Sequence, residues 1–247
     1  MRSPRFQNFL DKHEIDPLEY STPISRYVRL MKRETAVDKS FPSSGKSLTS
    51  DVETPPAESG IPRESTPVEY MPGFYRLPAH LDNINSLPGY KTGQILGMDV
   101  SSAIAVAALD LTPEDHVLDL CCAPGAKLCM IADIIGSSST GTVTGVDASS
   151  ARLGTCRGML KRVGLTERAR LFCADGALFD VYRPSRIGPR VLVDLSPSNK
   201  EICAGGDRKK VAFSSRWLRN DPQHRGAGLC YSKVIVDAEC THDGSIR

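Results

Sequence analysis

The residues best suited to hold a ligand form a short turn at positions 121–127. The turn consists of Cys121, Cys122, Ala123, Pro124, Gly125, Ala126 and Lys127. It follows an apolar run at residues 116–120 and precedes an amphipathic segment, an order in which the first N–H groups of a helix can hold a carboxylate. Gly125 permits a close approach that a side chain would forbid, while Pro124 fixes the turn. The turn lacks the Walker spacing and a complete G-x-G-x-x-G, which disfavours but does not exclude a nicotinamide-dependent enzyme.

Four acidic residues stand where four apolar runs end: Asp119, Asp147, Asp175 and Asp237. Ligands of parallel sheets bind beyond the carboxyl ends of the strands. One acid at such an end often caps a helix or faces solvent, but four of them define the rim of a pocket. Asp147 is placed to accept hydrogen bonds from both hydroxyls of a ribose, and Asp175 is placed to meet an adenine amino group.

Strands and helices are expected to alternate around these residues. The expected strands cover residues 116–120, 142–147, 170–174 and 231–237. The expected helices cover residues 126–135 and a segment that ends at Val163, with another beginning at Asp99 or Ser101. This order predicts an α/β fold with a parallel sheet and helices on both faces.

The flanking segments have weaker patterns. Residues 1–90 form a small irregular N-terminal region, in which 6–14 are compatible with a short helix and 26–30 alternate like a strand. Residues of about 35–68 are rich in Ser, Pro, Thr and Glu and are expected to be a flexible linker. Residues 91–247 form the second region, with an irregular insertion at about 182–230. A loop of that length is unusual inside a compact domain.

Composition limits the compartment and the partners. The 31 Lys and Arg residues nearly balance 29 Asp and Glu residues, so no general basic field indicates nucleic acid. No segment approaches the roughly 20 apolar residues of a membrane helix, and no secretory signal is evident. The eight cysteines form no C-x-x-C pair, so we expect no metal site and predict reduced thiols in an intracellular protein, in the nucleus or the cytoplasm.

The amino-acid sequence of the turn gives a more specific indication of function. Residues 121–127 resemble the C-A-A-P-G-G-K signature of the Sun (Sun/RsmB) family of S-adenosylmethionine-dependent RNA cytosine-5 methyltransferases. The similarity continues at 98–102, 145–149, Arg152, 161–164 and 175–176, and residues 237–240 are similar to the family's D-A-P-C. It covers about residues 90–180 and 231–243.

The resemblance implies a Rossmann-like class I methyltransferase sheet, S-adenosyl-L-methionine as cofactor, and tRNA or rRNA as substrate. It implies that residues 121–127 wrap the methionine end of the cofactor, that Asp147 holds the ribose, and that Asp175 lies near the adenine. Asp237 would lie near the reacting base and the methyl group, and Arg152 would support the cofactor-side acid. The resemblance indicates no oligomeric state.

The resemblance also implies covalent catalysis, in which a thiolate adds to cytosine C6 before C5 accepts the methyl group. Cys240 matches the family cysteine that assists product release, whereas the nucleophile of the T-C motif would fall beyond Arg247. Glu239 replaces the family's proline, and a nearby carboxylate raises a thiol pKa. We therefore expect residues 91–247 to be a partial methyltransferase domain with an incomplete sheet, inactive for want of a nucleophile. The alternative is a non-catalytic methyltransferase-like module that binds RNA or a partner.

Overall fold

The computed structural model describes most of the chain between residues 4 and 238. The described residues are 4–17, 25–31, 55, 57–81, 83–136, 139–184, 186–187, 210–214, 218–219 and 229–238. Cys240 and Glu239, most of the linker expected before residue 57, and most of the insertion expected after residue 187 lie outside them.

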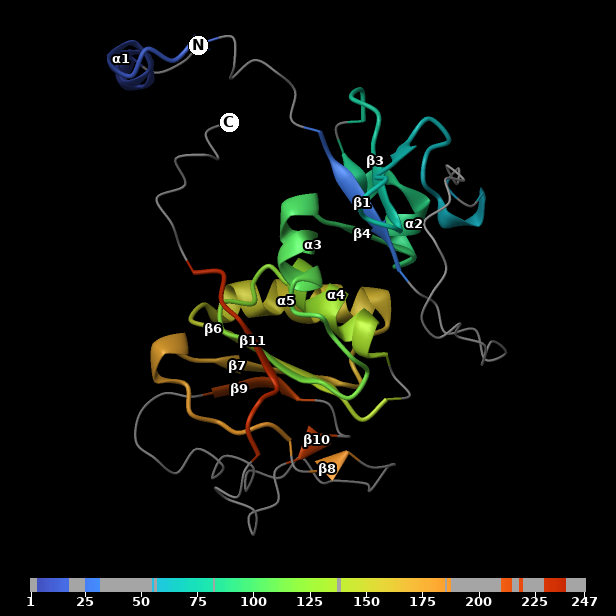
Figure 1. Ribbon diagram of the computed structural model, residues 1–247, viewed down its shortest axis with the longest axis vertical. Coiled ribbons are helices and arrows are strands. Elements are labelled where there is room, and N and C mark those ends of the chain that lie inside the picture. The colour runs from blue at the N-terminus through green and yellow to red at the C-terminus, as the bar shows by residue number, and fades with distance from the viewer. Residues whose placement is uncertain are drawn as a thin grey trace.

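A five-stranded sheet forms the centre of the molecule, with strand order β11-β5-β6-β7-β9 (Figure 1). The strands are β5 His116–Asp119, β6 Thr142–Asp147, β7 Ala169–Cys173, β9 Lys210–Ser214 and β11 Lys233–Ile235. β11, β5, β6 and β7 are parallel, and β9 pairs antiparallel with β7 at one edge. The four parallel strands and the α/β class that the sequence predicted are confirmed, whereas β9 falls in the expected irregular insertion.

The strand order contains a topological switch beside β5. From β5 the chain continues to β6 and β7 on one side, and β11 later pairs with β5 on the other side. Open α/β sheets bind ligands outside the carboxyl ends of the strands at such a switch. The topology therefore directs attention to Asp119, at the end of β5, and to the residues that follow it.

The described α-helices between residues 99 and 238 lie on one face of the central sheet (Figure 1). They are α3 Val100–Ala107, α4 Ala126–Ile135 and α5 Ser150–Val163. Leu128 and Ile131 of α4 and Leu153 and Leu160 of α5 are all at most 2% exposed and share one core with Val117, Val143 and Leu171 of the strands. Ser149 caps α5 by accepting a hydrogen bond from the N–H of Arg152, and Gly164 ends it in the left-handed conformation.

The expectation of helices on both faces is wrong for the part of the chain that the structure describes. The steps from β5 to β6 and from β6 to β7 run in the same direction, so right-handed crossovers place α4 and α5 on the same face. On the opposite face Leu118, Val146 and Phe172 pack against Phe179 and Tyr231. These two aromatic side chains come from the connection between β7 and β11, whose described residues include the 3₁₀ turn η4 Gly176–Leu178 and no α-helix.

The N-terminal region is more ordered than the sequence pattern indicated. It contains an antiparallel sheet of order β2-β3-β1-β4, built from β1 Tyr27–Leu30, β2 Thr66–Pro67, β3 Phe74–Arg76 and β4 Ile95–Gly97. The other elements of this region are α1 Pro4–Lys12, the 3₁₀ turns η2 Ala57–Ser59 and η3 Ile84–Ser86, and α2 Pro88–Lys91.

In the region expected to be an irregular insertion, the strands β8 Arg186–Ile187 and β10 Leu218–Arg219 form a separate antiparallel pair.

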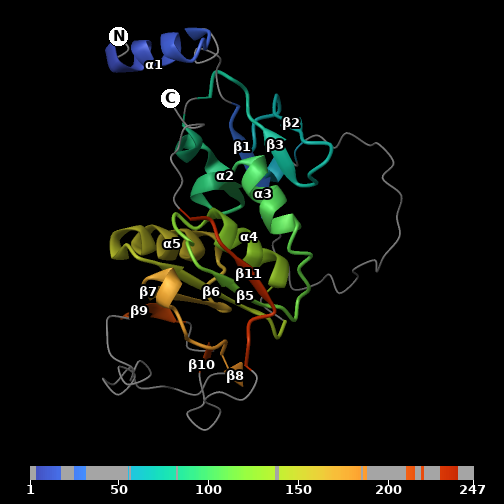
Figure 2. The same cartoon turned by 60° about the vertical axis from the view of Figure 1, so that its left-hand side comes forward.

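The N-terminal sheet packs on the helical layer of the central sheet, as Figures 1 and 2 both show. Phe74 and Leu96 belong to the same core as the buried residues of α4 and α5. Arg29 of β1 forms a buried ion pair with Asp133 of α4, at 2.6 Å between Nη2 and Oδ2. The two regions therefore share a continuous core and a buried charge contact.

Candidate functional site

The turn between β5 and α4 is held close to helix α5. Gly125 precedes α4 in the left-handed conformation, with φ of 114°. A Cβ atom at this position would lie 3.1 Å from the Cα atom of Cys156. The backbone angle therefore favours glycine, and a side chain here would press against α5.

Asp147, at the end of β6, holds the 121–127 turn in place through hydrogen bonds. Its side chain is buried, and its two oxygens accept hydrogen bonds from the backbone N–H groups of Ala123 at 3.2 Å and Ser149 at 2.9 Å. Arg152 of α5 donates from Nη2 to the carbonyl oxygen of Ala123 at 2.9 Å, and its Nη1 lies 3.7 Å from Asp147 Oδ2. Strand, turn and helix thus meet through one carboxylate and one guanidinium group.

An ion pair between Lys127 and Asp237 joins the start of α4 to the residues that follow β11. The side chain of Lys127 is 19% exposed and that of Asp237 is 58% exposed. These residues are 110 positions apart in the sequence, so the contact exists only because β11 lies beside β5. It places a cation and an anion at the switch between the two strands.

Asp119 has the least satisfied carboxyl group in this region. Its residue is 1% exposed, its Oδ1 accepts a hydrogen bond from the N–H of Cys121 at 3.3 Å, and its Oδ2 has no hydrogen-bond partner. Burial raises the pKa of Asp119 to about 7, with Asp237 and Asp147 adding to the rise and Lys127 opposing it. Sequence reasoning counted Asp119 among the rim acids but did not name it as a candidate site residue.

Asp175 lies at the end of β7, two strands away from β5 in the sheet. It is exposed, and its Oδ1 accepts a hydrogen bond from the N–H of Ala177 at 2.9 Å as the cap of η4. The next residue, Gly176, lies against Leu120, because an added Cβ would be 2.9 Å from the Leu120 carbonyl oxygen. Asp175 therefore borders the region of Asp119, Asp147, Lys127 and Asp237 without joining their contacts.

The environment of the turn raises the pKa of two of its cysteines, Cys121 and Cys122. Burial and the charges of Asp119, Asp147 and Asp237 raise the pKa of Cys121. A hydrogen bond between the Cys122 and Cys156 thiols, together with burial, strongly raises the pKa of Cys122. Because the thiolate is the nucleophilic form, neither Cys121 nor Cys122 is suited to attack a base. The role expected for Cys240 lies outside the described residues.

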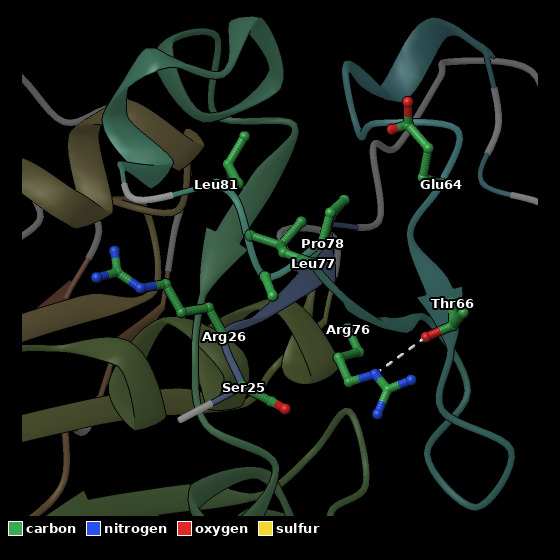
Figure 3. Close-up of a pocket in the computed structure, with 9 residues that line it drawn as sticks. Ser25, Arg26, Glu64, Thr66, Arg76, Leu77, Pro78 and Leu81 are labelled. Atoms are coloured by element: carbon green, nitrogen blue, oxygen red, sulfur yellow. Dashed lines mark hydrogen bonds between the residues drawn. The ribbon is translucent and has the colours of Figure 1, made fainter. Parts of the chain in front are cut away.

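A separate hollow of about 340 Å³ lies on the N-terminal sheet (Figure 3). Arg76 donates from Nε to Thr66 Oγ1 at 3.3 Å on its wall, and the side chain of Arg26 points away from that pair in the figure. The lining contains no residue of the 121–127 turn and none of the four strand-end acids. The hollow is therefore distinct from the site that the sequence predicted.

The described residues contain no group of three or more side chains arranged to hold a metal ion. Nor does any helix among them have the length and apolar character needed to cross a membrane.

Residues 106–223 match the family model described as 16S rRNA methyltransferase RsmB/F. A ribosomal RNA small subunit methyltransferase B from Pseudomonas syringae pv. tomato is 35% identical over 112 residues, 45% of this chain and 24% of that protein. A mouse 28S rRNA (cytosine-C(5))-methyltransferase is 36% identical over 121 residues, 48% of this chain and 14% of that protein. The chain thus spans between a seventh and a quarter of the length of these two relatives.

Among solved structures, a methyltransferase homolog protein from Pyrococcus horikoshii aligns with 70% of this chain and 57% of its own length, at 22% identity and a TM-score of 0.48. The sequence matches confirm the family resemblance that residues 121–127 indicated.

Proposed function

From the premise that residues 106–223 carry the sequence of the RsmB/F family, we propose that the strand ends of this chain bind S-adenosylmethionine. We propose further that the protein transfers the cofactor's methyl group to C5 of a cytosine in RNA, with ribosomal RNA as the substrate class. An RNA substrate also accords with the intracellular location that the cysteine content favours.

The observation that carries the proposal is the convergence of the 121–127 turn, Asp147 and the Lys127–Asp237 pair at the switch point beside β5. Four features fit the cofactor: a close-packed glycine turn, a carboxylate held at a strand end, a lysine, and a buried carboxyl oxygen without a partner. Bound S-adenosylmethionine would supply a methyl group activated by its sulfonium. The chain's own residues would then bind and orient it.

The residues have distinct proposed roles. Asp147 would accept the ribose hydroxyls, since its carboxylate is fixed by two backbone N–H groups and each oxygen keeps further acceptor capacity. Arg152 would hold the turn against Asp147. Asp175 would face the adenine from the neighbouring strand end. Lys127 would contact the methionine end of the cofactor, and Asp237 would lie near the reacting base.

A second candidate, binding without turnover, is favoured by the state of Cys121. This is the thiol that the described residues place among the strand-end acids, and burial together with the charges of these acids raises its pKa. Cys121 is therefore poorly suited to attack C6, which supports binding without turnover. Cys240 remains the predicted release-assisting cysteine.

Calorimetric titration with S-adenosylmethionine tests the binding proposal. Wild type should bind, and Asp147→Ala should bind more weakly by about 1.5–3 kcal/mol, as expected for loss of a charged acceptor. Equal affinity of the two proteins would remove Asp147 from the site.

Transfer of labelled methyl groups to unmodified RNA, with Cys240→Ala as control, separates the two candidates. Binding without transfer supports the non-catalytic candidate. Transfer that Cys240→Ala abolishes, with no covalent RNA–protein adduct in the variant, would make Cys240 the nucleophile.

A further inference from the structure

Asp119 stands apart from the other carboxylates at the strand ends because half of its hydrogen-bonding capacity is unused inside the protein. Its residue is 1% exposed, yet Oδ2 meets no donor. A buried carboxylate oxygen without a donor costs free energy, because the water it loses on burial is not replaced. An oxygen left in this state at a switch point is a place where a ligand donor would be stabilised.

The charged groups that face Asp119 come from every element packed around it. Lys127 of α4 is the cation that acts on Asp119 among the described residues, and it already forms an ion pair with Asp237. Arg152 of α5 lies farther out, with Nη1 3.7 Å from Asp147 Oδ2. Asp147 of β6 and Asp237 after β11 contribute two anions, and Cys121 lies beside them as a neutral thiol. The arrangement carries an excess of negative charge, which favours a bound proton or a bound cation.

We infer that the carboxyl group of Asp119 holds a proton in the ligand-free protein and releases it when the ammonium group of the cofactor donates to Oδ2. This inference rests on the proposed function, because it concerns the same site. It assigns to Asp119 a positioning role for the amino-acid end of the cofactor. It also makes the affinity of the site depend on pH near neutrality.

The physical basis is linkage between two cations that compete for one carboxylate. A proton and an ammonium group cannot both occupy Oδ2, so binding of one displaces the other. Burial supports the protonated state, since it raises the pKa of Asp119 to about 7. A donated N–H bond and a nearby positive charge favour the ionised state and lower that pKa again.

Two ligands that differ at the amino-acid end provide a matched comparison. S-adenosylhomocysteine carries the ammonium group and no sulfonium, whereas 5′-methylthioadenosine keeps the adenosine and lacks the amino acid. Calorimetry in two buffers of different ionisation enthalpy should show release of about one proton at pH 6 with S-adenosylhomocysteine and none with 5′-methylthioadenosine. The affinity for S-adenosylhomocysteine should fall about fivefold from pH 7 to pH 6.

Two variants serve as controls. Asp119→Asn should abolish proton release and flatten the pH dependence, while Asp147→Asn should weaken binding at every pH and keep the release. Absence of proton release in wild type, or equal release with both ligands, would overturn the inference.

A measurement on wild type alone separates this inference from the proposed function. Carbon-13 labelling of the aspartate carboxyl groups should reveal one that titrates near pH 7 in the free protein and is ionised at pH 6 after S-adenosylhomocysteine is added. If every carboxyl group titrates below pH 5 in the free protein, the inference fails even where the cofactor binds. If S-adenosylhomocysteine binds and the midpoint near 7 is unchanged, the coupling is refuted and the proposed function stands. If no adenosyl ligand binds, the proposed function fails and the inference fails with it.

Discussion

The two ends of strand β5 carry the same type of residue in opposite states. At the amino end, Asp115 accepts hydrogen bonds from the Thr112 N–H at 2.8 Å, the Thr112 hydroxyl at 3.2 Å and the Ser232 hydroxyl at 2.6 Å. At the carboxyl end, Asp119 has one backbone donor at 3.3 Å and an oxygen without a partner. Both residues are buried, so the difference lies in what the chain offers each carboxylate.

The pKa shifts of the two acids have opposite signs for this reason. Burial works to raise the pKa of Asp115, but hydrogen bonds from Ser232 and Thr112 bring it below its ordinary value. Burial raises the pKa of Asp119 without that compensation. An acid that the chain satisfies contributes to the fold, whereas an acid that the chain leaves unsatisfied is available to a ligand. The comparison separates a structural end of the strand from a functional one.

The largest expected effect concerns the turn at the functional end. Gly125→Val should abolish measurable S-adenosylmethionine binding, because the new side chain meets α5 and the backbone angle is unfavourable. The protein should also lose about 3 kcal/mol of stability. Gly154→Ala in α5 is the control, since its Cβ would meet open space, and it should stabilise the helix by about 0.5–1 kcal/mol. Normal binding by Gly125→Val would show that the turn does not hold the cofactor.

Substitution of Asp115, at the amino end of β5, and of Asp147, at the carboxyl end of the neighbouring strand β6, tests the comparison. Asp147→Ala should lower cofactor affinity by about 10- to 100-fold. Asp115→Ala should leave affinity unchanged and lower the unfolding free energy by about 2 kcal/mol, because three donors lose their acceptor. Calorimetric titration and urea unfolding of both variants measure the two quantities. Loss of affinity in Asp115→Ala would contradict the separation between the two ends.

The pH dependence of the unfolding free energy tests the state of Asp119. Asp119 binds its proton more tightly in the folded protein, so its contribution to stability is present below pH 3.8 and is lost as the pH rises through about 7. Asp119→Asn should therefore raise the unfolding free energy by about 4 kcal/mol at pH 8.5 and by little at pH 4. Urea unfolding at the two pH values measures this. A variant that is destabilised at pH 8.5 would show that Asp119 is satisfied.

The smallest expected effect comes from His116, at the structural end. Its Nδ1 lies 2.8 Å from Thr142 Oγ1 and its Nε2 lies 2.9 Å from Arg183 Nη1. Burial and the charge of Arg183 lower the pKa of His116 to about 4. The folded protein resists protonation here, so stability should fall as the pH drops from 6.5 towards 4. His116→Gln should reduce this fall by about 1 kcal/mol, since solvent screens a half-buried ring. An identical pH profile for the variant would exclude His116 as the cause.

The sequence predicted the functional end better than it predicted the structural one. Apolar runs that end in Asp119, Asp147 and Asp237 are local patterns, and a glycine turn after a strand is equally local. The network at the amino end joins His116 to Ser232 and Arg183 across long stretches of sequence, and no spacing rule identifies such partners. Of the N-terminal sheet, the alternation at residues 26–30 predicted β1, whereas the other strands escaped prediction because runs of two or three residues show almost no alternation.

The unsatisfied oxygen of Asp119 could not be predicted from the sequence either. Its position at a strand end was evident, but the absence of a donor depends on how Lys127 is drawn to Asp237 by the pairing of β5 with β11. A residue type can be read from the chain, whereas the number of its partners is decided by packing.

The buried pair of Arg29 and Asp133 places a constraint on how this protein can vary. Replacing either residue alone leaves a charge in the shared core, at a cost of about 3–5 kcal/mol. Replacing both with apolar residues of similar volume is often neutral or stabilising. The two positions, one in the N-terminal sheet and one in α4, are therefore expected to change together among related chains, as a pair of opposite charges or as a pair of apolar side chains.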